Sequence, residues 1–280
     1  MKKIVTIQDI SCFGKCSLTV ALPVISAMGI ETAVIPTAVL STHTGGFEGY
    51  TFHSLSSDIS DISAHWKSLG LKFDGIYTGY LGTKSQVQII SDFFDDFSTE
   101  DNFIVVDPVM GDAGRLYAGL EEGLVAEMKR LCAKADYILP NMTEACFLLD
   151  MPYSEIHTEA QIKDILRRLT DLGCAFPVLT GVRYDSEHHG AAAYDSVNDS
   201  FCFAFGKHVD RQIHGTGDIF ASVFTGAAAL GRDLEDSLNM AVQFVSDCIE
   251  ATLPNFDEVW YGSCFELCLD KLIGYTKGNL

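Results

Sequence analysis

Two glycines precede an aspartate in the sequence HGTGD at residues 214–218, directly before an apolar run that predicts a helix. Glycines leave backbone N–H groups unobstructed and a helix N-terminus carries partial positive charge, so this segment suits an anion such as phosphate. Asp218 would then lie beside the anion, where it could act as a general base that takes a proton from an attacking hydroxyl. The spacing also fits a simpler role, in which Asp218 only caps the helix.

Two more acidic segments follow predicted strands. DPVMGD at 107–112 comes directly after a strand over 103–107, and NMTE at 141–144 follows the next one. Ligands of open α/β sheets bind beyond the carboxyl ends of the strands. Two carboxylates and an amide at that edge could hold Mg²⁺, which prefers oxygen ligands. Asp112 and Asn141 could equally be turn or cap residues.

Polar residues also close the first two strands. QDIS at 8–11 ends strand one, and STHTGG at 41–46 follows strand two, so both are expected at the same sheet edge. The pair His188-His189 lies in a polar stretch and is interpreted as solvated surface rather than as a metal site.

Composition excludes several classes of partner. The 280 residues carry a formal net charge of -19, which repels nucleic acid and anionic membranes. Nine scattered cysteines without a CxxC pair indicate reduced thiols rather than disulfides or structural zinc. Gln8 and Asp9 interrupt the first apolar stretch, and no apolar run reaches about 18 residues. We therefore expect a cytoplasmic protein that binds small molecules.

Short β-branched runs alternate with amphipathic stretches, which predicts a three-layer α/β sandwich with a mostly parallel central sheet. One domain over residues 1–280 is expected. Residues 184–206 predict two short strands around a turn at 196–200, and this hairpin is also a candidate flap over a nucleotide. The predicted strands are 3–8, 32–36, 75–78, 103–107, 137–139 and 177–180; the predicted helices are 18–28, 85–97, 120–133, 159–172, 218–230, 234–252 and 258–273.

Taken in order, these segments resemble the ribokinase superfamily and, within it, the pyridoxal (vitamin B6) kinases. The resemblance runs over IQD at 7–9, STHTG at 41–45, TGYLG at 78–82, DPVMGD, the PN-x-x-E block at 140–144, LTG at 179–181 and GTGD, and so over most of the chain. Each motif is weak alone, but their order at successive strand ends is specific.

The resemblance implies phosphoryl transfer from ATP to the 5′-hydroxymethyl group of a B6 vitamer, with Mg²⁺ and a place for a monovalent cation such as K⁺. It implies Asp218 as base and a homodimer as the assembly. The other implied roles are an anion hole from the backbone of Gly215, Thr216 and Gly217; metal ligation by Asp112, Glu144 and Asp107; nucleotide contacts from Asp112, Asn141, Glu144, Thr180, Gly181 and Tyr117; and substrate contacts from Asp9, His43, Thr44 and Tyr80.

One position departs from the family pattern. In many pyridoxal kinases the residue after I-Q is a serine that faces the pyridine nitrogen, whereas here it is Asp9. A carboxylate there would favour a protonated ring nitrogen. Alternatively, Asp9 turns away and caps the helix that starts near Ser17.

Other functions on the same or related folds stay open. Hydroxymethylpyrimidine kinase shares the fold and the G-x-G-D motif, and a non-catalytic nucleotide-binding regulator would also fit the fold, although it predicts a lost base. A sugar kinase would carry an early β-lid, and a dehydrogenase would need G-x-G-x-x-G after the first strand; neither feature is present.

Overall fold

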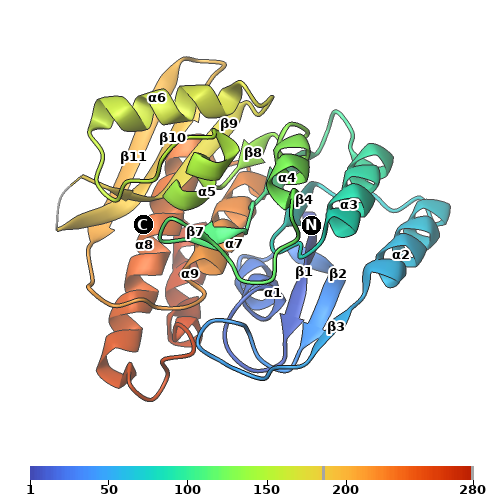
Figure 1. Ribbon diagram of the computed structural model, residues 1–280, viewed down its shortest axis with the longest axis horizontal. Coiled ribbons are helices and arrows are strands. Elements are labelled where there is room, and N and C mark those ends of the chain that lie inside the picture. Colours follow the sequence, from blue (N-terminus) through green and yellow to red (C-terminus); the bar gives the residue numbers. More distant parts are fainter. Residues whose placement is uncertain (185–186, 279–280) are drawn as a thin grey trace.

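A nine-stranded sheet runs through the centre of the computed structural model, which describes residues 1–184 and 187–278 (Figure 1). Within these residues the strand order is β11-β10-β9-β8-β5-β4-β1-β2-β3. The six inner strands pair in parallel, while β3 at one edge and β10 and β11 toward the other edge pair antiparallel. The strands are β1 (Lys3–Ser11), β2 (Glu31–Leu40), β3 (Phe52–Ser54), β4 (Gly75–Thr78), β5 (Phe103–Val106), β8 (Tyr137–Ile138), β9 (Phe176–Arg183), β10 (His188–Asp195) and β11 (Ser200–Lys207).

Helices cover both faces of this sheet (Figure 1). Successive residues of the inner strands point to opposite faces, so Val5 and Ile7 join one buried cluster and Ile4 joins the other. The expected three-layer architecture with a mostly parallel sheet is therefore confirmed. One face carries α2 (Ser56–Ser68), α3 (Lys84–Phe97), α4 (Leu124–Cys132), α5 (Met142–Leu148) and α6 (Glu159–Thr170); the other carries α1 (Leu18–Ala27), α7 (Thr216–Ala229), α8 (Leu234–Thr252) and α9 (Leu269–Thr276).

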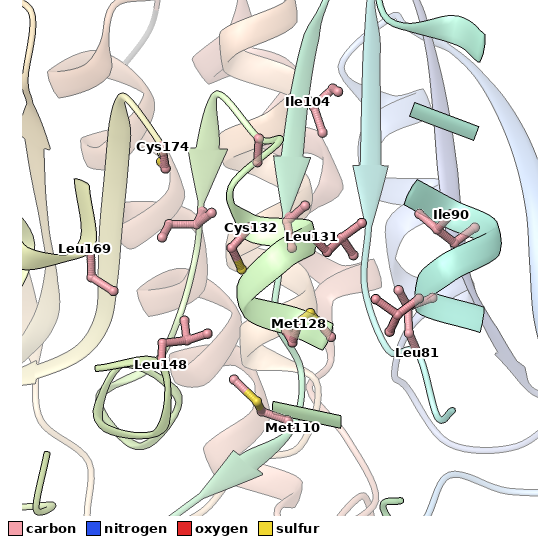
Figure 2. Packing of buried hydrophobic residues seen from close by; sticks show 14 of the residues in the cluster. Leu81, Ile90, Ile104, Met110, Met128, Leu131, Cys132, Leu148, Leu169 and Cys174 are labelled. Atoms are coloured by element: carbon pink, nitrogen blue, oxygen red, sulfur yellow. The ribbon is translucent and has the colours of Figure 1, made fainter. Parts of the chain in front are cut away.

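The core on the α2–α6 face reaches directly under the acidic loop 107–112. Figure 2 shows Met128 of α4 and Leu148 of α5 near Met110, which has no exposed surface. Because Met110 is anchored in this core, the polar residues on either side of it are held in place at the sheet edge. The loop is thus anchored to the core through Met110.

Two helices predicted from the sequence begin later than expected. The predicted helix 120–133 starts at Leu124, after a left-handed Gly123. The predicted helix 258–273 is wrong over its first half, because α9 begins only at Leu269, after a short 3-10 turn over Phe265–Cys268. The residues before that turn make a few local turn hydrogen bonds, such as Val259 N–H to Asn255 O, and others to distant loops, such as Ser263 N–H to His214 O. Helix α2 was not predicted, since only Ile59 and Ser63 of its thirteen residues are buried.

The stretch 184–206 forms the predicted hairpin, but the interpretation of its strands as a flap is wrong. Strands β10 and β11 pair in register from His188↔Lys207 to Asp195↔Ser200 and complete one edge of the sheet. Ala191, Ala192 and Ala193 have at most 1% exposed surface and belong to the two core clusters. A strand packed in this way cannot open without exposing the core. Residues 185–186 lie outside the described part of the chain.

The thiols agree with the prediction from composition. All nine cysteines are free, and most of them are buried. Across the described residues, no helix combines the length and the apolar character that crossing a bilayer requires.

Candidate active site

The predicted site residues converge at the carboxyl ends of the parallel strands, beside the N-terminus of α7. Asp9 lies near the end of β1, Tyr80 follows β4, Asp107 follows β5 and Asn141 follows β8. The phenol of Tyr117 reports how close the acidic groups lie, because its pKa is raised by burial and by the charges of several carboxylates. These are Glu144, Asp112, Asp107 and Asp218.

Asp218 is the third residue of α7, and the alternative that it caps this helix is wrong. The N-cap is Gly215, which adopts the left-handed conformation with φ 81°. Asp218 therefore presents its carboxylate from the first turn, half-buried among protein atoms. Burial raises its pKa from 3.8 to about 7; the charge of Asp9 adds to this effect, and a backbone hydrogen bond from Ser17 opposes it. A carboxylate with a pKa near neutrality suits general-base catalysis.

Gly215 is required by packing as well as by its backbone angle. A Cβ at this position would lie 2.0 Å from the carbonyl oxygen of Lys15. Gly217, two residues on, has a helical backbone and nothing within 4 Å of the corresponding position. The first turn of α7 therefore has one side closed against the loop 12–17 and another open to solvent, where an anion could approach the backbone amides.

Asp9 is buried, with 4% of its surface exposed, and it does not cap α1. Its Oδ2 accepts a hydrogen bond of 3.1 Å from the Ser11 hydroxyl, and the hydroxyl of Ser17 also bonds to this carboxylate. Burial raises the pKa of Asp9, and these hydrogen bonds partly offset the effect. Ser17, at the strained φ of 54°, thus lies between two carboxylates: its hydroxyl contacts Asp9 and its N–H contacts Asp218.

His43 is buried, and both of its ring nitrogens are bound by the protein. The backbone N–H of Gly45 donates to Nδ1 at 3.0 Å, so Nδ1 carries the lone pair and Nε2 carries the hydrogen. Nε2–H then donates to the carbonyl oxygen of Tyr261 at 2.7 Å. The ring can therefore offer a ligand its face but no hydrogen bond. Thr44 is exposed beside it, whereas Tyr80 is half-buried, with its pKa raised by burial and by Asp9.

Glu144 and Asn141 form a capping box at the start of α5. Glu144 accepts the backbone N–H groups of Asn141 at 2.8 Å, Met110 at 3.0 Å and Gly111 at 3.5 Å. The Asn141 amide in turn donates to the carbonyl oxygen of Gly111 at 2.8 Å. Through these hydrogen bonds Glu144 holds the acidic loop 107–112 in place, a role that the sequence did not predict. Burial raises the pKa of Glu144 and of the neighbouring Asp107, whose carboxylates repel each other.

Asp112 lies on a small hairpin of β6 (Gly111–Asp112) and β7 (Arg115–Leu116). It is exposed, and its oxygens accept only the N–H of Ala113 at 2.8 Å and the amide of Gln212 at 3.4 Å. Within residues 1–184 and 187–278, no three His, Cys, Asp or Glu side chains are grouped closely enough to hold a metal by themselves. The predicted metal residues Asp107, Asp112 and Glu144 thus share a region without forming a closed cage.

Thr180 and Gly181 lie at a β-bulge where β9 meets β10. Thr180 pairs with Ala191 while Val182 pairs with Gly190, so Gly181 is the extra residue, with φ 69°. The N–H of Thr180 donates to the Pro140 carbonyl oxygen at 2.9 Å, which ties this bulge to the start of the Asn141 segment. His189 lies on β10, close to Gly181, and is exposed, in agreement with its interpretation as surface.

The sequence did not predict the roles of Ser17, Lys15 or Tyr261. Lys15 and Tyr261 contribute backbone atoms, which no residue type reveals. The only available signal was Gly14 in the loop 12–17, since a glycine with φ 97° marks a tight chain reversal.

A three-layer α/β fold with a glycine-rich turn at a helix N-terminus and carboxylates at the strand ends defines a ribokinase-like kinase. The chain belongs to the phosphomethylpyrimidine kinase family, whose model matches residues 19–259. This family assignment agrees with the resemblance read from the sequence motifs.

Relatives in this class carry two kinds of activity in their names. The hydroxymethylpyrimidine/phosphomethylpyrimidine kinase of Bacillus subtilis is 26% identical over 252 residues, covering 89% of this chain and 82% of the relative. The pyridoxine/pyridoxal/pyridoxamine kinase of Bordetella pertussis is 26% identical over 266 residues, covering 89% of each. The chain spans about half the length, 47%, of the thiamine biosynthetic bifunctional enzyme TH1 of Arabidopsis thaliana, at 27% identity over 259 residues and 91% of this chain.

Two solved structures are similar over nearly the whole chain. A protein of Bacteroides thetaiotaomicron, described as a "putative phosphomethylpyrimidine kinase" in a crystal form with pyridoxal, is 40% identical with a TM-score of 0.92, covering 97% of this chain and 95% of that one. The pyridoxal kinase of Lactobacillus plantarum is 31% identical with a TM-score of 0.90, covering 99% of this chain and 98% of that one.

Proposed function

We propose that this protein transfers the γ-phosphoryl group of ATP to the 5′-hydroxymethyl group of a vitamin B6 vitamer. The observation that carries the proposal is the pair of carboxylates Asp9 and Asp218 at the edge of the sheet, close enough for the charge of Asp9 to raise the pKa of Asp218. Asp218 takes the proton from the attacking hydroxyl. The amides of residues 215–217 stabilise charge on the transferring phosphoryl group.

Asp9 favours a pyridine over a pyrimidine substrate. It is buried and forms no ion pair within the described part of the chain, so a cationic ring would compensate its charge. A pyridine nitrogen is more basic than a pyrimidine nitrogen, and a protonated pyridine therefore fits this carboxylate better. The likeness to a protein crystallised with pyridoxal and to a pyridoxal kinase supports the same choice.

The acidic region fits Mg²⁺ bound together with the nucleotide. Asp107, Glu144 and Asp218 are crowded, and none of the ion pairs between described residues involves them. Mg²⁺ usually keeps several waters and needs only one or two carboxylates besides phosphate oxygens. Exposed Asp112 is the residue with carboxylate oxygens free enough to take part, while Glu144 keeps the loop in shape. Such an ion would neutralise phosphate charge in a chain of net charge -19.

A panel of acceptors tests the proposed function. ATP consumption with Mg²⁺ is measured against pyridoxal, pyridoxine, pyridoxamine, hydroxymethylpyrimidine, adenosine and ribose. We expect turnover with the three B6 vitamers and little with the others. A preference for hydroxymethylpyrimidine would place the protein with the other activity of its family, and nucleotide binding without turnover of any acceptor would favour a regulator.

Asp9→Ser should change the relative kcat/KM among the three vitamers, because the ring nitrogen loses its anionic partner. Asp9→Asn is the matched control, since it keeps the size of the side chain and removes only the charge. If charge is what matters, both variants should shift the ratios in the same direction. Ratios equal to those of the parent in both variants would show that Asp9 does not contact the ring.

A further inference from the structure

Three loops of the site meet at one short segment near the end of the chain, Tyr261–Ser263. The carbonyl oxygen of Tyr261 accepts the Nε2–H of His43 at 2.7 Å and the backbone N–H of Lys15 at 3.4 Å. The N–H of Ser263 donates to the carbonyl oxygen of His214 at 3.2 Å. Three consecutive residues thus bind the loop that carries His43, the loop 12–17 and the turn that begins α7.

These loops pack closely against one another at glycine positions, where there is no space for a side chain. A Cβ at Gly262 would lie 2.5 Å from the Cβ of Lys15, and a Cβ at Gly14 would lie 2.1 Å from the ring of His43. A Cβ at Gly45 would lie 2.7 Å from the ring of His214. The carbonyl oxygen of Lys15 in turn packs against Gly215. Since interiors packed in this way transmit displacement, a shift of the segment would be felt at both His43 and the glycine turn.

The far side of the segment is fixed to the core. The N–H of Cys264 donates to the buried hydroxyl of Thr252 at the end of α8, at 2.8 Å. Lys15 Nζ pairs with Glu266 at 2.8 Å, which closes the loop 12–17 over the segment. The segment is therefore anchored at one end and in contact with two catalytic loops at the other.

We propose that Tyr261–Ser263 is a positioning strap, which sets the distance between His43 in the acceptor site and the anion-hole turn 214–217, with the Tyr261 carbonyl accepting the Nε2–H of His43. This inference deepens the proposed function and rests on it for the roles of the two loops. The strap touches no reacting atom. Its effect is on the alignment of the attacking hydroxyl with the phosphoryl group, where a misplacement of about 1 Å costs about 10²-fold in rate.

Gly262→Ala tests the strap, because the added methyl group must push it away from Lys15. We expect kcat to fall by about 10- to 100-fold while the Kd for nucleotide stays near that of the parent. Lys15→Gly removes the two side-chain carbons that the methyl group would meet. The double variant Lys15→Gly/Gly262→Ala should therefore recover the kcat of Lys15→Gly alone. Leu267→Ala, at an exposed position just beyond the strap, is the control and should keep the kcat of the parent.

Imidazole ¹⁵N NMR of His43 supplies a readout that needs no substrate. The parent protein should show the Nε2–H tautomer. In Gly262→Ala the tautomer should stay, because Gly45 still donates to Nδ1, but the Nε2–H resonance should shift as its hydrogen bond to Tyr261 weakens. A parent with Nδ1–H, or a folded Gly262→Ala with parental kcat and a parental Nε2–H resonance, would overturn the strap. So would a loss of kcat that tracks thermal stability and is not recovered in the double variant. If no B6 vitamer is turned over, the proposed substrate fails, yet the Nε2–H resonance of His43 and the kcat of whichever acceptor reacts still decide the strap.

Discussion

Asp218→Asn should lower kcat by about 10²–10⁴-fold, the usual share of a general base. Asparagine keeps the shape of the side chain and can still accept the hydrogen bond from Ser17, but it cannot take a proton from the substrate hydroxyl. Nucleotide affinity should be kept or increased, since a negative charge beside the phosphates is removed. Single-turnover phosphoryl transfer and nucleotide binding, measured on the same preparation, separate these two effects. A variant with intact kcat would show that Asp218 is not the base.

The pH dependence of kcat/KM should follow the same group. Because burial raises the pKa of Asp218 to about 7, the free enzyme holds the active, ionised form only above that pH. We expect kcat/KM to rise with pH through about 7 and to level off above it. Asp218→Asn should lose this limb of the profile. A parental profile that stays flat between pH 6 and pH 8 would contradict the assignment.

Stability provides the control for this variant, and its sign follows from the same pKa. The folded-state pKa of about 7 lies above the ordinary value of 3.8, so the folded protein binds the proton more tightly than the unfolded chain does. Ionised Asp218 therefore destabilises the fold increasingly as the pH rises from about 4 to above 7. At pH 8, Asp218→Asn should unfold at no lower denaturant concentration than the parent. Lower activity with equal or higher stability would then be a chemical effect.

The architecture could be predicted from the sequence where local pattern and tertiary packing agree. Helix α8 has the bounds predicted for it, because apolar residues at helical spacing coincide with an Asp233 N-cap whose side chain accepts the N–H of Asp236. Strand β4 likewise matches its apolar run. Helix α2 was missed because its serine- and aspartate-rich sequence buries little, so its position is decided by the chain around it.

The candidate site, like the fold, could be predicted from the sequence only in part. Residues to which the proposed function assigns side-chain roles, such as Asp9, Asp218 and His43, stood out in the sequence through their types and their places at strand ends or in the glycine motif. The structure added contacts in which backbone atoms take part: the Tyr261 carbonyl on His43, the Ser17 N–H on Asp218, and the amides that Glu144 accepts. Every residue type supplies a carbonyl, and every type except proline supplies an N–H group, so such partners leave almost no pattern in a single sequence.

Gly215→Ala should abolish activity through the fold, while Gly217→Ala should lower activity without weakening the fold. At Gly215 the left-handed φ of 81° costs an alanine about 1–3 kcal/mol. The Lys15 carbonyl oxygen, 2.0 Å from the new Cβ, cannot move without displacing the loop 12–17. We expect a clearly lower urea midpoint for Gly215→Ala and no measurable turnover.

Gly217 lies in the same turn, but its environment reverses the sign of the stability change. Its backbone is helical and nothing lies within 4 Å of the added methyl group, so alanine should stabilise the helix by about 0.5–1 kcal/mol. A helical Cβ leans toward the N-terminus of its helix, which here is the side from which a phosphoryl group would reach the amides. Turnover should therefore fall by about tenfold or more, toward the 10²–10³-fold loss that follows removal of one anion-hole donor. Urea unfolding and kcat measured on both variants test this prediction. Full activity in Gly217→Ala would mean that the phosphoryl group does not approach this turn, because the added methyl group would lie in its path.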